Sequence, residues 1–126
     1  MSFSNYLENK VMLHVFGGTS YTAPATLYVG LYTSDPGEGN TGTEVSGGSY
    51  ARQSAAFTIT DNAAANTAAI EFPTASGSWG TVTYVGISDA VSGGNLLASG
   101  ALTTSKTISS GDVFRIPAGD LDITLD

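Results

Sequence analysis

Short segments of alternating apolar and polar residues, separated by clusters of Gly, Asn, Asp and Ser, fill the chain from residue 26 onward. Such clusters are typical of tight turns, and a two-residue alternation is typical of strands with one buried face. The pattern predicts an all-β fold: a compact β-sandwich, jelly-roll or Greek-key like, with seven to eight strands. The expected strands are 26–33, 54–60, 67–72, 81–88, 95–102, 112–117 and 121–125.

One of these segments departs from clean alternation. In SWGTVTYVGISD (78–89), Val82 and Tyr84 lie on one alternation, whereas Val85 and Ile87 lie on the other. A strand with one face in water should be apolar on one side only. We therefore expect one face inside the sandwich and the other covered by the second sheet's edge, the N-terminal helix or a neighbouring subunit. The tryptophan of this stretch is expected to anchor the start of the strand.

A single helix is predicted ahead of the strands, at about residues 4–16. Ser4 is a suitable N-cap, and the glycines at 17–18 are suitable for the helix end. Tyr6 and Leu13 lie outside the main apolar arc, which consists of Leu7, Val11, Met12, Val15 and Phe16. A helix that is apolar on more than one face is usually covered on more than one face.

Two interpretations of this helix stay open, one in which it packs only within its own domain and one in which it also contacts a second subunit. The second interpretation places an oligomer or partner interface at Tyr6, Leu13, Phe16, Tyr28 and Tyr32.

Composition limits the functional classes. The 126 residues fit one domain, 1–126, with no linker or internal repeat. Only 12% of residues are charged, against about 25% in a typical domain, and such a neutral surface is easily desolvated against a neighbour. The net charge of −7 argues against nucleic-acid binding. The absence of cysteine excludes a disulfide framework, and no apolar run approaches the ~20 residues of a membrane helix.

The longest irregular segment, 34–49, is rich in glycine and acidic residues. Long loops are more often functional or mobile than short ones, so we interpret it as an exposed contact loop. Its candidate contact residues are Asp35, Glu38, Glu44 and Tyr50. Acidic oxygens on a loop can bind calcium, but their spacing does not match a calcium loop, and no metal site is predicted.

Little in the chain indicates catalysis. His14 is the only histidine and lies on the predicted helix. No nucleophile elbow or phosphate-binding loop is present, so we expect a protein that is not an enzyme and has no cofactor. The aromatic side chains are compatible either with core and interface packing or with a sugar-binding face. They include Tyr21, Tyr28, Tyr32, Tyr50, Trp79 and Tyr84.

Six stretches, spread over nearly the whole chain, together form a sequence pattern that is fairly specific. They are HVFGG (14–18), APATLYVGLYT (23–33), GTEVSGGSYARQ (42–53), SWGTVTYVGISD (78–89), GGNLL (93–97) and GDL (119–121). In these stretches the chain resembles small phage virion proteins known as phage tail fibre proteins. The resemblance implies a structural part of a virion and brings no catalytic motif with it.

Three roles stay open. As a tail fibre or tail-tip component, the protein would direct its long loop toward the host. As a capsid decoration (cement) protein, it would clamp the head lattice, a role favoured by its small size and lack of a fibrous repeat. Outside the virion, it would be a free glycan-binding module.

The partners follow from these roles. In both virion roles we expect a symmetric oligomer, most simply a trimer, together with other virion proteins. The glycan-binding role adds a host surface glycan. The expected location is the virion, after assembly in the host cytoplasm, with no nucleic acid bound and no membrane insertion.

Overall fold

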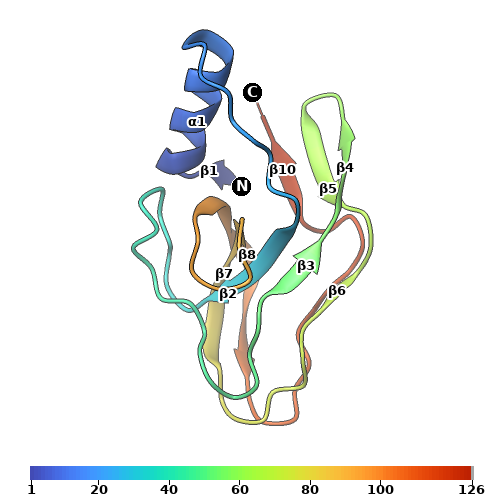
Figure 1. Cartoon of the computed structure of the whole chain (residues 1–126). Coiled ribbons are helices and arrows are strands. Elements are labelled where there is room, and N and C mark those ends of the chain that lie inside the picture. Colours follow the sequence, from blue (N-terminus) through green and yellow to red (C-terminus); the bar gives the residue numbers. More distant parts are fainter. Residues whose placement is uncertain (126) are drawn as a thin grey trace.

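The computed structural model describes residues 1–125 (Figure 1). Within these residues, one helix and ten strands follow one another along the chain. The predicted all-β fold with one N-terminal helix is confirmed. The elements are β1 (Ser2–Phe3), α1 (Asn5–Phe16), β2 (Leu27–Tyr32), β3 (Gln53–Ala55), β4 (Phe57–Thr60), β5 (Ala63–Asn66), β6 (Ile70–Glu71), β7 (Gly80–Ser88), β8 (Leu96–Ile108), β9 (Arg115–Ile116) and β10 (Asp122–Thr124).

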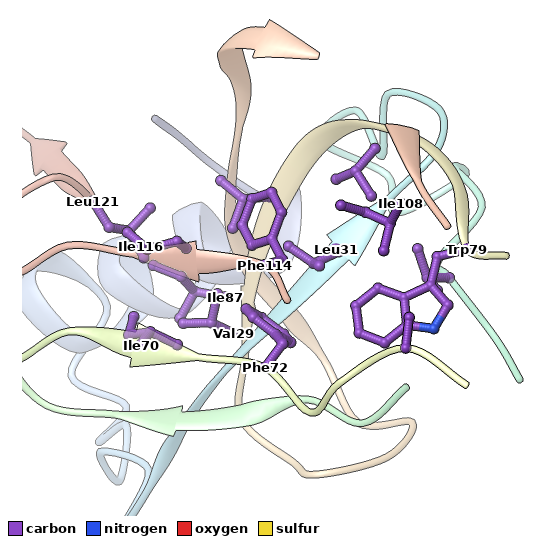
Figure 2. Close-up of a cluster of buried hydrophobic side chains, with 14 residues drawn as sticks. Val29, Leu31, Ile70, Phe72, Trp79, Ile87, Ile108, Phe114, Ile116 and Leu121 are labelled. Carbon is purple, nitrogen blue, oxygen red and sulfur yellow. The ribbon is translucent and has the colours of Figure 1, made fainter. Parts of the chain in front are cut away.

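The strands form three antiparallel sheets. The largest has the order β1-β8-β7-β2-β3, and the other two have the orders β10-β5-β4 and β6-β9. Buried side chains from the largest sheet and from β6 and β9 belong to one hydrophobic cluster. Figure 2 shows Val29 and Ile87 of the largest sheet next to Ile70, Ile116 and Phe72. The core therefore lies between two layers of strands, as expected of a compact β fold.

Several expected strand boundaries were wrong. The segment 54–60 divides at Ala56 into β3 and β4, which belong to different sheets. The segment 67–72 is reduced to β6, and the preceding β5 was missed because its sequence, AAAN, contains no apolar–polar alternation. The short β1 was also missed. β8 extends to Ile108, and its largely exposed second half is rich in Thr, a residue favoured in strands.

An irregularity between β7 and β8 explains the unusual pattern of residues 78–89. Val82 pairs with Lys106, whereas Tyr84 pairs with Ala101. Residues 102–105 of β8 thus lie opposite the single residue Thr83. Such an insertion of extra residues is a β-bulge, and it interrupts the alternation of β7. The result is that Val82 joins Val85 and Ile87 in the core cluster.

At Gly86, the second face of β7 is covered by side chains from the neighbouring strands of the same sheet. A Cβ atom placed on Gly86 would lie 2.7 Å from a ring carbon of Tyr32 and 2.9 Å from a methyl carbon of Leu96. Tyr32 and Leu96 come from β2 and β8, the two strands that flank β7. At this position the cover comes from within the largest sheet and not from the second sheet or the helix.

Trp79 anchors the start of β7, as expected. Its side chain is 4% exposed, and its backbone N–H donates to the carbonyl of Ile108 at 2.9 Å. The indole Nε1 donates to the carbonyl of Gly48 at 2.8 Å. The indole and the Tyr50 ring pack edge to face, with their centroids 5.4 Å apart. One side chain thereby joins the long loop to the largest sheet.

We predict that Trp79→Ala lowers the free energy of unfolding by about 3–5 kcal/mol, because it leaves a large cavity in the core. Trp79→Phe should cost less, about 1–3 kcal/mol, since it keeps a ring but removes the donor to Gly48. Urea unfolding followed by far-UV circular dichroism measures both.

The matched control is Val91→Ala at a side chain that is 58% exposed, which should change stability by less than about 0.5 kcal/mol. A Trp79→Ala protein as stable as this control would contradict the core position of the indole.

Candidate functional site

The N-terminus of α1 is fastened to the largest sheet through Ser4. The Ser4 hydroxyl accepts the N–H of Leu7 at 3.1 Å, which confirms the predicted cap, and donates to the carbonyl of Leu96. The Ser4 N–H donates to the Leu97 carbonyl at 2.7 Å, and the Asn5 N–H donates to the Glu38 carbonyl at 2.9 Å. Ser4 is only 3% exposed. These bonds fix where the helix begins relative to β8 and the long loop.

The rest of α1 is poorly covered. None of its 12 residues is buried, and Met12, Val15 and Phe16 are 57%, 60% and 79% exposed. The chain after the helix folds back onto it, because His14 Nδ1 accepts the N–H of Tyr21 at 3.1 Å. A helix of this length is marginal in water by itself, and its stability normally comes from burial of an apolar face. The exposed face of α1 is therefore suited to contact with another molecule.

Further exposed apolar side chains lie at the same end of the molecule. Figure 1 shows that α1, the end of β10 and the β4–β5 hairpin all project toward this end. Ile59 of β4 is 68% exposed and Leu125 is 53% exposed, and the Leu125 N–H donates to the carbonyl of Asn62 between β4 and β5. We call the set Met12, Val15, Phe16, Ile59 and Leu125 the α1-end patch.

An open groove of about 600 Å³ runs between α1, β1 and the end of β10. Two acidic residues, Glu8 and Glu38, lie on it among apolar side chains that include Phe3, Val11 and Met12. The pKa of Glu8 is raised. Desolvation is the largest cause, and the repulsion from Glu38 and the hydrogen bond with Glu38 are smaller causes in the same direction. The groove thus combines apolar walls with an acidic pair.

A second cluster closes the long loop. Arg52 holds Glu44 with two bonds, from Nε to Oε2 and from Nη2 to Oε1, both 2.8 Å. The Tyr50 hydroxyl donates to Glu44 Oε2 at 2.6 Å and accepts the Leu31 N–H at 2.9 Å. Gly30 provides the space, since a Cβ there would lie 2.7 Å from Glu44 Oε2. We call Glu44, Tyr50 and Arg52 the loop lock.

Arg52 also joins the lock to the β7–β8 turn. Its Nη1 donates to the carbonyls of Ala90 at 2.8 Å and Gly93 at 2.9 Å. Burial by itself would raise the pKa of Glu44, but the hydrogen bonds from Arg52 and Tyr50 and the positive charge of Arg52 outweigh burial, and the pKa is lowered. Desolvation and the bond to Glu44 raise the pKa of Tyr50, so its hydroxyl stays protonated.

The structure distributes the predicted contact residues over three places. Tyr6, Leu13 and Phe16 lie on α1, and only Phe16 is largely exposed. Tyr28 and Tyr32 lie on β2, where Tyr32 is 2% exposed and covers Gly86.

The loop residues divide in a similar way. Asp35 and Glu38 are exposed, whereas Glu44 and Tyr50 point into the loop lock. Sequence reasoning did not single out the patch members Met12 and Val15, since it placed them on the main apolar arc. Ile59 and Leu125 were assigned to strand faces, and no signal in their segments marked them as exposed.

Two further findings concern residues 1–125. No group of three or more His, Cys, Asp or Glu side chains in this part of the chain is arranged to hold a metal ion. α1, the helix that these residues form, is too short to cross a membrane.

Comparison with known proteins identifies a relationship over nearly the full length. The model of the family described as podophage GP4 fiber I protein gp80 matches residues 2–124. No curated protein matches the chain.

We predict that Glu44→Gln destabilises the fold by about 1.5–3 kcal/mol at neutral pH, because Arg52 loses a charge-assisted partner. Since the pKa of Glu44 is lowered from 4.5, its stabilisation is present above that pH and disappears as pH falls through the folded-state pKa. The difference in urea midpoint between wild type and Glu44→Gln should therefore shrink from pH 7 to pH 3.

A double-mutant cycle with Arg52→Gln is the control. The double variant should be less destabilised than the sum of the single variants, because the pair is coupled. Additive effects, or a midpoint difference independent of pH, would show that the pair does not act as a unit.

Proposed function

The chain belongs to the podophage GP4 fiber I protein gp80 family, and we propose that it is a non-enzymatic structural subunit of a phage tail fibre or tail tip. One observation carries this proposal: α1 is fixed to the body at its N-terminus yet leaves Met12, Val15 and Phe16 exposed. Apolar surface of this kind is typical of a site for another protein. The helix is then the part that joins the subunit to its neighbours in the virion.

The interface of this proposal is the α1-end patch together with Tyr6 and Leu13 on the same helix. Asp35 and Glu38 remain candidate contact residues, because both are exposed on the long loop. Tyr32, Glu44 and Tyr50 support these surfaces from within. We further propose that residues 1–126 act as one domain, that the protein assembles in the host cytoplasm, and that its oligomer is symmetric.

The polar groups support a structural role over catalysis. The ring of the sole histidine accepts a backbone N–H from Tyr21. The carboxylate of Glu44 is held by Arg52 and Tyr50. Both groups are already engaged in hydrogen bonds that stabilise the chain around them. A catalytic base, in contrast, needs access to a proton of the substrate.

The burial of Trp79 bears on the glycan-binding alternative. At 4% exposure and with its Nε1 bonded to Gly48, the indole is not available to stack on a sugar ring. This observation favours a structural subunit over a free glycan-binding module.

Capsid decoration remains the second candidate. It is favoured by the short elements, since the longest strand has 13 residues, about 43 Å at the usual rise of a strand. The chain by itself forms no extended shaft.

We predict that Phe16→Ser reduces incorporation into particles more than tenfold while leaving the fold intact. Burial of a Phe side chain contributes about 1.5–3 kcal/mol, and 1.4 kcal/mol corresponds to tenfold in affinity. Copies per purified particle, measured by quantitative mass spectrometry, give the result.

Val91→Ser is the matched control, because Val91 is similarly exposed but lies on the β7–β8 turn. Equal incorporation of wild type, Phe16→Ser and Val91→Ser would exclude α1 as the attachment site.

The same measurement separates the two virion roles. For a tail fibre or tail-tip component, we expect few copies of the wild-type chain relative to the major capsid protein. A copy number comparable to that of the capsid protein would instead support decoration of the head lattice.

A further inference from the structure

The outer edge of β8 is largely unpaired. On one side β8 pairs with β7 except at residues 102–105, which bulge out opposite Thr83, and on the other side it pairs with β1 only at Ala98 and Ser99. From Gly100 to Thr107, β8 has no strand partner on that side among residues 1–125. An exposed strand edge presents free N–H and C=O groups, and such an edge is a template for pairing with another strand.

A groove of about 490 Å³ runs along this edge. Its other wall is formed by β9 and the following turn, and β9 in turn pairs only with β6. Apolar side chains lie along the groove, among them Leu102, Phe114 and Leu121. The free stretch of β8 is rich in Thr, a residue well suited to strand pairing. The site therefore offers both a free strand edge and an apolar surface beside it.

The charges on this groove are balanced, unlike those of the rest of the chain. Lys106 and Arg115 line it together with Asp120 and Asp122. Two of the four basic residues and two of the eleven acidic residues thus lie here, which leaves two basic and nine acidic residues elsewhere. Within residues 1–125, the one ion pair of the chain joins Arg52 to Glu44. The four groove charges are therefore available for pairing with another molecule.

This distribution favours a second copy of the same chain as the partner. Two copies with a net charge of −7 repel each other through most of their surfaces. Across two facing β8 grooves, however, the basic residues of one copy can lie opposite the acidic residues of the other. A self-complementary patch is what a two-fold interface requires, because each copy contributes the same residues.

We propose that the outer edge of β8 is a self-association surface, on which the β8 edge of a second copy pairs in antiparallel fashion. Lys106 and Arg115 of each protomer lie opposite Asp120 and Asp122 of the other. The pairing extends the largest sheet across both copies and leaves the α1-end patch free for other virion proteins. The inference rests on the proposed role as a structural subunit and adds a two-fold contact to it.

Charge reversal in the full-length chain tests the proposal. The first variant carries Lys106→Glu and Arg115→Glu, and the second carries Asp120→Lys and Asp122→Lys. All proteins also carry Phe16→Ser, so that the α1-end patch does not contribute to association. Sedimentation velocity at low salt gives the mass, and thermal unfolding followed by circular dichroism confirms that each variant is folded.

We expect the Phe16→Ser parent to dimerise and to dissociate as salt is raised, because screening weakens the charge pairs. Each double variant alone should dimerise at least about tenfold more weakly, since like charges then face each other. An equimolar mixture of the two should restore a dimer with one copy of each, which native mass spectrometry identifies by mass. Val91→Lys, at an exposed residue of the β7–β8 turn that lines neither surface, should leave the dimer unchanged.

Three results would overturn the proposal. They are a parent that stays monomeric at every concentration, double variants that dimerise like the parent, and folded variants whose mixture stays monomeric. The proposed function is tested separately, by incorporation into particles. If the protein enters particles but does not dimerise, only the β8 proposal fails. If it dimerises through β8 but does not enter particles, only the proposed function fails.

Discussion

The guanidinium of Arg52 joins the long loop to the β7–β8 turn and, through its partners, to β2. It binds Glu44 in the long loop and the carbonyls of Ala90 and Gly93 in the β7–β8 turn. Through Glu44 and Tyr50 it reaches the Leu31 N–H on β2. A charge that is 9% exposed is stable only when it is paired, so the loop has to close over it. The predicted contact loop is thereby held in a defined shape.

The sequence was sufficient for features that depend on local chemistry. The cap at Ser4, the end of α1 and the strand containing Val29 and Leu31 follow from residue type and spacing. The sequence was insufficient for features whose position depends on tertiary contacts. β5 consists of small residues whose position comes from pairing with β4 and β10. The bulge opposite Thr83 depends on β8, which no pattern within β7 reveals.

The candidate surfaces could be predicted only in part, for a related reason. An apolar arc on a helix predicts contact with something, but it does not distinguish the core from solvent or a partner. Phe16 and Met12 lie on the same arc as Leu7, yet the attachment at Ser4 turns the far end of the arc outward. Tyr32 shows the opposite case, because the absence of a side chain at Gly86 allows it to be buried within its own sheet.

The attachment of α1 also has a mechanical consequence. The helix is bonded to β8 through Ser4 at Leu96 and Leu97, and β8 lies next to β7 inside the largest sheet. A pull on the far end of α1 therefore passes along the helix to Ser4, which is bonded to β8, and to Asn5, which is bonded to the Glu38 carbonyl in the long loop. From Ser4 it spreads as shear over the β7–β8 ladder, where many hydrogen bonds share the load. A subunit held by its helix would transmit tension into its largest sheet as well as into the long loop.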